Sequence, residues 1–319
     1  DPSAKSKPGD GVRIEDYETA YETAKNTSSK VRPGNKLFNE PVKAFKDIAD
    51  KYHERFFGKP RSKFKGTRDL DVKKSKRISD AFEAMKHDPN NPEVKKAYED
   101  LANETIEQYK DFIAAGYVIE IDNKEPYANS GEMIADLRDN KRLRIFSTES
   151  GFGDNAITDK ERSENPLLRK TQFTDINGST MLVNDLFRGI HDAFGHGELG
   201  NGFGPKGEEN AWNVHSRMFS PSARRAMTTE TRGQNSWVNF SGVNDKIKPL
   251  KAEAKRLREE GASEEDVKKI VDKIYEIGSF AKQKIGLMPK EFSSLDGDTK
   301  TEWDEWSDNP KGWEGGKIF

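Results

Sequence analysis

The chain has five histidines in 319 residues, and His191, His196 and His215 fall within one short stretch. Glu208 and Glu209 lie between the second and the third of them. Cysteine is absent, so a metal in this stretch must take imidazole and carboxylate ligands. Two histidines with one carboxylate are the donor set of non-haem iron enzymes, whereas zinc held by three protein ligands activates water. We therefore expect Fe(II) at this site, with Zn²⁺ as the alternative.

The spacing of the first two histidines is awkward for a metal site on an α-helix. Residues five apart point about 140° away from each other in an ideal helix. Gly195, immediately before His196, can end or distort the helix and bring the second imidazole round. Asp192 is expected to orient an imidazole by accepting a hydrogen bond from it.

The carboxylate ligand is expected on the next helix. Glu208, Trp212 and His215 are spaced to share one face of it, and Glu208 or Glu209 lies near its start. His215 is expected either as a further ligand or as a partner of one. The opposing interpretation is a buried hydrogen-bond network of His and Glu that holds the fold together without any metal.

The segment His191-Asp192-x-Phe194-Gly195-His196 resembles the His-Asp-x-Phe-Gly-His motif of bacterial phenylalanine hydroxylases, which belong to the pterin-dependent aromatic amino-acid hydroxylases. The resemblance covers six residues and implies that the two histidines and a later glutamate bind Fe(II). Glu230 is the nearest equivalent of that glutamate, because Glu208 and Glu209 follow sooner than the family pattern requires. The family's proline after the second histidine is missing.

A longer run, from "NPLLRKTQF" through "VNDLFRGIHDAFGHG" to "ETRGQNSWVNF", is similar to uncharacterised domains of phage-encoded polyproteins. This similarity implies a structural or ejected protein of a phage particle, with other virion proteins as partners. The His/Glu cluster would then be a polar core. The expected location is inside a cell or within a phage particle, because the polar N-terminal residues do not form a signal peptide.

A polar segment further along is a candidate substrate pocket. Within Thr228–Phe240, Arg232 can pair with a carboxylate or phosphate of a small-molecule substrate, and Trp237 can stack on it. Together with Asp192 these are the predicted catalytic residues. The alternative for Arg232 is a plain Arg–Glu ion pair. The glycines between 200 and 207 are expected to let the chain cross close to the site.

Charge limits the other possible partners. The formal net charge is −2, so no global field favours nucleic acid or membrane. Residues 51–80 carry 11 Lys and Arg against 4 Asp and Glu, which makes this stretch the candidate surface for nucleic acid. No apolar run approaches the roughly 20 residues that span a bilayer.

Hydrophobic spacing predicts a mainly α-helical protein with a small β element, an α+β class built on one core. Residues 1–35 are expected to form an extended arm, 36–290 the helical core, and 291–319 an acidic tail containing Trp303, Trp306 and Trp313. Two strands are expected at 117–121 and 142–148. Further expectations are a helix from Pro92 to Gly116, a helix capped by Ser130, and a helix broken by Pro249.

Overall fold

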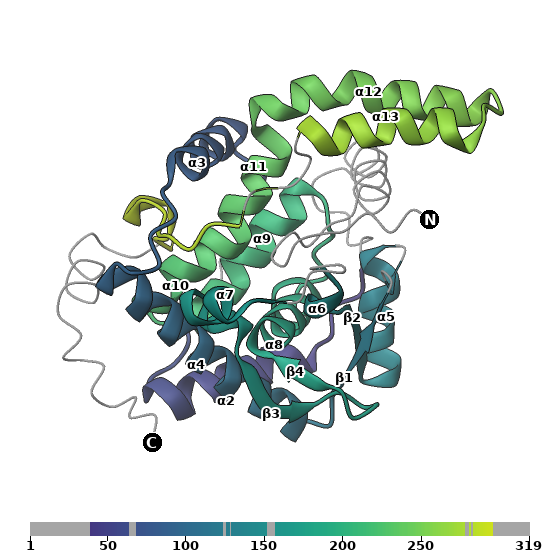
Figure 1. The fold of residues 1–319 in the computed structure, drawn as a ribbon. Coiled ribbons are helices and arrows are strands. Elements are labelled where there is room, and N and C mark those ends of the chain that lie inside the picture. The colour runs from purple at the N-terminus through teal and green to yellow at the C-terminus, as the bar shows by residue number, and fades with distance from the viewer. Residues whose placement is uncertain are drawn as a thin grey trace.

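A computed structural model of the chain describes residues 39–63, 68–123, 126–127, 129–151, 157–277, 281 and 283–295. The predicted arm at 1–35 and the three tail tryptophans lie outside the described residues. The fold is mainly helical with a small β content, as predicted, and it has two small two-stranded sheets (Figure 1).

The helices and strands follow one another along the whole described chain. The α-helices are α2 (Ala44–Phe57), α3 (Val72–Ala84), α4 (Pro92–Ala114), α5 (Ser130–Asn140), α6 (Thr148–Gly151), α7 (Asp159–Glu164), α8 (Val183–Ile190), α9 (Pro205–His215), α10 (Pro221–Thr228), α11 (Gln234–Phe240), α12 (Gly242–Glu259) and α13 (Glu264–Ile277). Two π-helical segments, η2 (His191–Gly197) and η4 (Thr229–Gly233), continue α8 and α10. Short 3₁₀ turns are η1 (Pro166–Leu168), η3 (Ser216–Met218) and η5 (Lys290–Phe292).

The two predicted strands form a parallel pair. β1 (Val118–Asp122) lies beside β2 (Arg142–Phe146), and α5 makes the crossover between them. The second sheet is the antiparallel pair β3 (Lys170–Thr174) and β4 (Thr180–Leu182), which the sequence interpretation did not include. β4 leads directly into α8, so this hairpin fixes where the histidine-bearing helix begins.

Two local expectations need correction, and the structure of one further segment is now defined. Asn129, rather than Ser130, caps α5, because its side chain accepts the backbone N–H of Glu132. Pro249 lies inside α12 without breaking it. The polar segment around Trp237 is helical, as η4 and α11, although its residues have low helix propensity.

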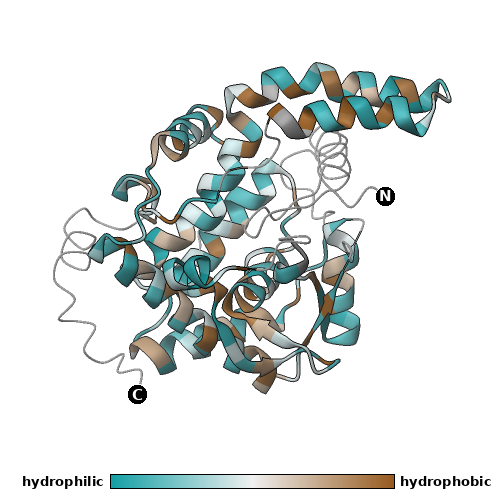
Figure 2. Cartoon of the chain, viewed as in Figure 1, coloured by the Kyte–Doolittle hydropathy of each residue, from teal (hydrophilic) through white to brown (hydrophobic). Residues whose placement is uncertain are grey.

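α4 is the central helix of the core. It packs against α10, α8 and α2, and it starts with Pro92 and stops before Gly116 (φ 85°), as predicted. Tyr98, Leu101 and Phe112 of this helix are completely buried. α12 and α13 instead pair with each other as a hairpin around a small apolar cluster, and their outer faces are polar (Figure 2). Within the described residues, no helix is both long and apolar enough to cross a membrane.

A buried acid joins α4 to the start of α10. Glu104 is completely buried and accepts hydrogen bonds from the Ser220 backbone N–H (2.8 Å) and hydroxyl (2.6 Å). Ser220 in turn caps α10 through the backbone N–H of Ala223. Burial raises the pKa of Glu104 to about 8, which outweighs the lowering effect of the two hydrogen bonds.

We predict that Glu104 makes the stability of the protein depend on pH. Between pH 4.5 and 8 the folded chain keeps a proton on this carboxyl that the unfolded chain has lost, so stability should fall as the pH rises through that window. Urea unfolding at pH 5.5 and 8.5 should therefore show a pH difference that is smaller in Glu104→Gln by roughly 1–2 kcal/mol. The exposed control Glu54→Gln should keep the wild-type difference; an unchanged difference in Glu104→Gln would contradict this account.

Candidate metal centre

The first two histidines lie on a π-helical segment. α8 does not end at Gly195; it widens at His191 into η2, whose hydrogen bonds join residues five apart. This register brings His191 and His196 to one side of the helix, with ring centroids 5.3 Å apart. The awkward spacing is therefore resolved by a wider helical turn rather than by a helix end.

Gly195 serves this site by letting α9 come close. A Cβ built on Gly195 would lie 3.1 Å from the backbone oxygen of Ala211 on α9 and 3.3 Å from Cε1 of His191. Both contacts are tighter than side chains ordinarily make. The missing side chain thus allows the helix that carries Glu208 to pack on the histidine segment.

Glu208, in the first turn of α9, completes the cluster. Its Oε2 lies 3.8 Å from Nε2 of His191 and 3.6 Å from Nε2 of His196. The three donor atoms all lie within 4.8 Å of one another. Both imidazoles are buried, and the Glu208 side chain retains 20% of its exposure. These three residues are hereafter the His–His–Glu cluster.

The tautomer of His196 follows from its hydrogen bonds. Its Nδ1 lies 3.2 Å from the backbone oxygen of Asn201, which can only accept, so Nδ1 carries the hydrogen. The Asn201 side-chain amide donates to the carbonyl of Gly195 (2.9 Å) and fixes this turn. In a neutral His196 the Nε2 lone pair therefore faces Glu208.

The tautomer of His191 follows from a longer chain of buried groups. The Gln108 amide donates to the backbone oxygen of Met218 (3.2 Å), which leaves its Oε1 to accept from Nε2 of His215 (2.8 Å). Burial lowers the pKa of His215 well below its usual value, so this ring is neutral and its Nδ1 is an acceptor. His191 Nδ1, 3.2 Å away, must then donate to it. His191 also presents its Nε2 lone pair to Glu208.

The charges of the cluster are strongly linked. Burial opposes ionisation of Glu208, but the adjoining His196 and His191 lower its pKa to about 2. Burial opposes protonation of His196, yet the Glu208 carboxylate raises its pKa above the usual value. Two imidazole lone pairs facing one carboxylate oxygen repel it, so the arrangement requires either protons on the rings or a cation between the three donors.

The other predicted ligands have different partners. Glu209, next to Glu208, forms a bidentate ion pair with Arg232. Glu230 accepts from Tyr98, Gln234 and Gln283, and it is not part of the His–His–Glu cluster. His215 supports His191 from behind, as described above.

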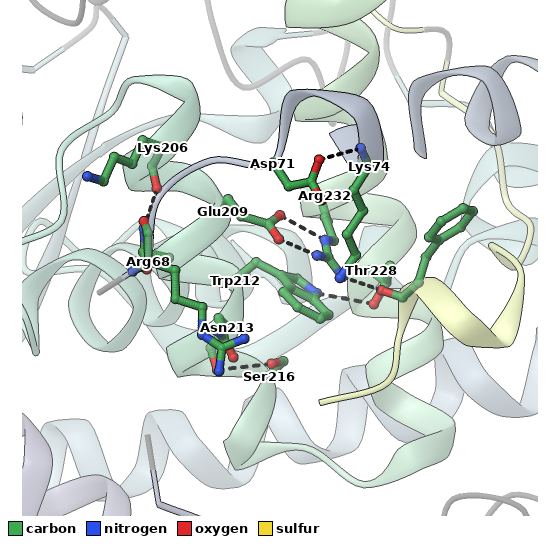
Figure 3. A network of polar contacts seen from close by, with 12 residues as sticks. Arg68, Asp71, Lys74, Lys206, Glu209, Trp212, Asn213, Ser216, Thr228 and Arg232 are labelled. Atoms are coloured by element: carbon green, nitrogen blue, oxygen red, sulfur yellow. Dashed lines mark hydrogen bonds and ion pairs between the residues drawn. The ribbon is translucent and has the colours of Figure 1, made fainter. Parts of the chain in front are cut away.

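The predicted catalytic residues are also placed differently from the expectation. Arg232 stacks on Trp212, with its guanidinium carbon 3.8 Å from the ring centroid, and also donates to the backbone oxygen of Phe292 (Figure 3). Its donors are thus used inside the protein, in agreement with the alternative of an Arg–Glu pair. Trp237 donates to Glu83 and packs in a separate apolar cluster. Asp192 accepts no hydrogen bond from the two imidazoles, whose Nδ1 atoms bond to Asn201 and His215.

Gln108 and Asn201 are the site residues that the sequence interpretation missed. Gln108 lies on the buried face of α4, at helical spacing from Leu101, Thr105 and Phe112. A polar residue within such an apolar face signals a buried hydrogen-bond partner, and it is the signal that could have identified this residue.

The glycines between 200 and 207 allow a close crossing, as expected. A Cβ on Gly207 would lie 1.8 Å from the backbone oxygen of Gly202. Lys206 pairs with Asp69 (2.7 Å). Beside this crossing is a small cavity, open to solvent on one side, and Glu208 forms part of its wall. Its lining residues are Leu70, Ser75, Pro205, Glu208, Glu209, Arg232, Asn235, Ser236 and Phe240.

No protein-family model, curated protein or solved structure matches this chain.

We predict that Gly195→Ala separates α9 from the histidine segment. The added methyl group meets backbone and ring atoms that cannot easily move, so the free energy of unfolding should fall by about 1–3 kcal/mol. The matched control is Gly242→Ala, because a Cβ at Gly242 meets nothing within 4 Å. Chemical denaturation of both variants checks the prediction, and equal stabilities would refute it.

Proposed function

We propose that the chain is a metalloprotein with a mononuclear site formed by His191, His196 and Glu208. The observation that supports it is the pair of Nε2 lone pairs directed at one carboxylate oxygen in a buried place. Each ring is fixed from behind through its Nδ1 atom, the usual outer support of a metal-binding histidine. The proposed function is an iron-dependent oxidative enzyme that acts on a small molecule.

The ligand set leaves coordination positions open. Three protein ligands are typical of catalytic sites, whereas structural zinc sites are closed by four. A bound Fe(II) would supply oxidative chemistry with O₂, and a bound Zn²⁺ would instead activate water. The short resemblance to the aromatic amino-acid hydroxylases favours iron, although Glu208 takes the place that the resemblance gives to Glu230.

The donor spacing keeps zinc as a second candidate. For metal–ligand bonds of about 2.1 Å, neighbouring donors lie about 3.4 Å apart in a tetrahedron and about 3.0 Å apart in an octahedron. The two His–Glu separations of 3.8 and 3.6 Å are closer to the tetrahedral value. The metal that co-purifies with the chain decides between them.

The rival function is a structural protein, as in a phage particle, with the cluster as a metal-free polar core. Protons on the imidazoles would then relieve the repulsion. The two functions respond to pH with opposite sign. The raised pKa of His196 stabilises the metal-free protein below about pH 6.5, and this contribution is lost as the pH rises through the folded pKa. Metal binding needs deprotonated imidazoles, so its stabilisation grows as the pH rises.

We predict one metal ion per chain in protein purified without chelator. Elemental analysis should show its loss in His191→Ala, His196→Ala and Glu208→Gln, because each variant removes one of only three ligands. His87→Gln, outside the cluster, should retain the full content. Added metal should raise the unfolding midpoint more at pH 7.5 than at pH 5.5. A wild-type chain that binds neither iron nor zinc would overturn the proposal.

We also predict that Gln108→Leu weakens metal binding without touching a ligand. Without the Gln108 carbonyl the tautomer of His215 is no longer fixed, and neither is the ring of His191. Outer-shell substitutions of this kind typically cost 10–100-fold in metal affinity. Competition titration with a chelator measures the loss, and circular dichroism checks that the variant is folded. Unchanged metal affinity in a folded Gln108→Leu protein would show that the hydrogen-bonded chain from Gln108 through His215 to His191 does not support the site.

A further inference from the structure

Arg61 is a buried arginine in the loop that follows α2. Its side chain retains 7% of its exposure, although the residue belongs to the basic stretch 51–80, the candidate surface for nucleic acid. Nη1 and Nη2 donate to the two carboxylate oxygens of Glu198 (2.8 and 2.7 Å), and Nε donates to Asp50 on α2 (2.9 Å). The Glu198 side chain is 5% exposed. The two residues therefore form a buried bidentate ion pair, whose geometry is more specific than that of a surface contact.

The loop that carries Arg61 is hydrogen-bonded on both sides of this residue. The backbone oxygen of Lys59 accepts from Nδ1 of His53 on α2 (2.7 Å). The Ser62 hydroxyl accepts from the guanidinium of Arg217 in η3 (3.0 Å). The neighbours of Arg61 in the chain are thus fixed to α2 and to η3, and its side chain extends from a defined place.

Glu198 lies in the turn that orients the His196 imidazole. Two hydrogen bonds close this turn. The backbone N–H of Asn201 donates to the His196 carbonyl (2.9 Å), and Nδ1 of His196 donates to the Asn201 carbonyl (3.2 Å). Glu198 stands between the two bonded residues, so its ion pair connects the turn to Arg61 and, through Arg61, to α2.

The planar fork of arginine suits this task. It donates two parallel hydrogen bonds to one carboxylate, which fixes the direction of the Glu198 side chain as well as its distance. Arg61→Lys would keep the positive charge but could not reproduce the fork. A change at Arg61 that leaves its charge in place therefore tests the geometry of the pair.

We propose that Arg61 is a positioning residue of the metal site, which holds the His196 imidazole in place by fixing the turn at Glu198. This inference rests on the proposed metal site for its effect on metal affinity. Arg61 acts through Glu198 and not as a ligand. One cation of the basic stretch 51–80 is thereby assigned to the interior of the protein.

Zn²⁺ affinity of the full chain, measured by competition with a chelator, tests this role. Arg61→Lys should weaken zinc binding about tenfold, the lower end of the range for outer-shell substitutions. Glu198→Gln should cause a similar loss. The double variant should lose little more than either single variant, because the two residues act as one unit.

The matched control is Arg55→Lys. Arg55, on α2, also donates to two carboxylates, those of Glu107 and Asp111 on α4. The control therefore makes the same substitution in another arginine that bonds two acids, and zinc affinity should stay within about twofold of the wild type.

A second measurement needs no metal. The His196 ring is 1% exposed and its Nδ1 proton is hydrogen-bonded, so in the metal-free protein this proton should exchange slowly and give a low-field NMR signal. Arg61→Lys should broaden the signal beyond detection, whereas Arg55→Lys should keep it. A substitution that only lowered global stability would leave the signal in place while the chain is folded.

The outcomes separate this inference from the proposed function. If the wild type binds zinc and both Arg61→Lys and Glu198→Gln bind it equally tightly, the inference alone falls. An equal loss of affinity in Arg55→Lys overturns it too, because the effect would not depend on the turn. If the wild type binds neither zinc nor iron but Arg61→Lys still removes the His196 signal, the positioning role stands and the proposed metalloprotein falls.

Discussion

The repulsion between two imidazole lone pairs and one carboxylate oxygen is the constraint on which the rest of the site depends. The hydrogen bonds from Nδ1 to Asn201 and to His215 leave both Nε2 atoms facing Glu208. A buried polar group without a compensating partner costs several kcal/mol, so this geometry is stable only with a positive charge among the three donors. The surrounding helices hold the donors in place for that charge.

The positioning of the donors explains departures from regular helix nearby. A π-helical turn is rare, and it tends to mark functional sites because it sacrifices regular hydrogen bonds. Here the π-helical turn of η2 brings His191 and His196, five residues apart, to the same side. Gly195 lets α9 approach this segment closely. The second π-helical segment, η4, carries Glu230 and Arg232 into two different buried networks. Both irregular segments thus place polar side chains in buried surroundings.

Residue spacing in the sequence predicted most helices, the parallel pair of strands and the residues at the centre of the site. It did not predict which buried side chains around the site are hydrogen-bonded to each other. Hydrophobic spacing located most helices and both strands of the parallel pair, because it reflects burial directly. The His–His–Glu cluster lies within a window short enough for local spacing to relate its members. The other hydrogen bonds of the site join residues far apart in the sequence. Gln108 bonds to His215, 107 positions away, and Tyr98 bonds to Glu230, 132 positions away. No local pattern states which buried carboxylate meets which donor, so the assignments of Glu230, Arg232 and Trp237 could not be settled from spacing.

Glu208 and Glu209 are neighbours on α9 but have different partners in the site. Successive side chains on a helix point about 100° apart. Glu208 consequently faces the histidines while Glu209 faces Arg232, so about 100° of rotation around α9 separates the His–His–Glu cluster from the stacked Arg232 and Trp212. Because Glu209 neutralises Arg232, this ion pair adds no net charge beside Glu208.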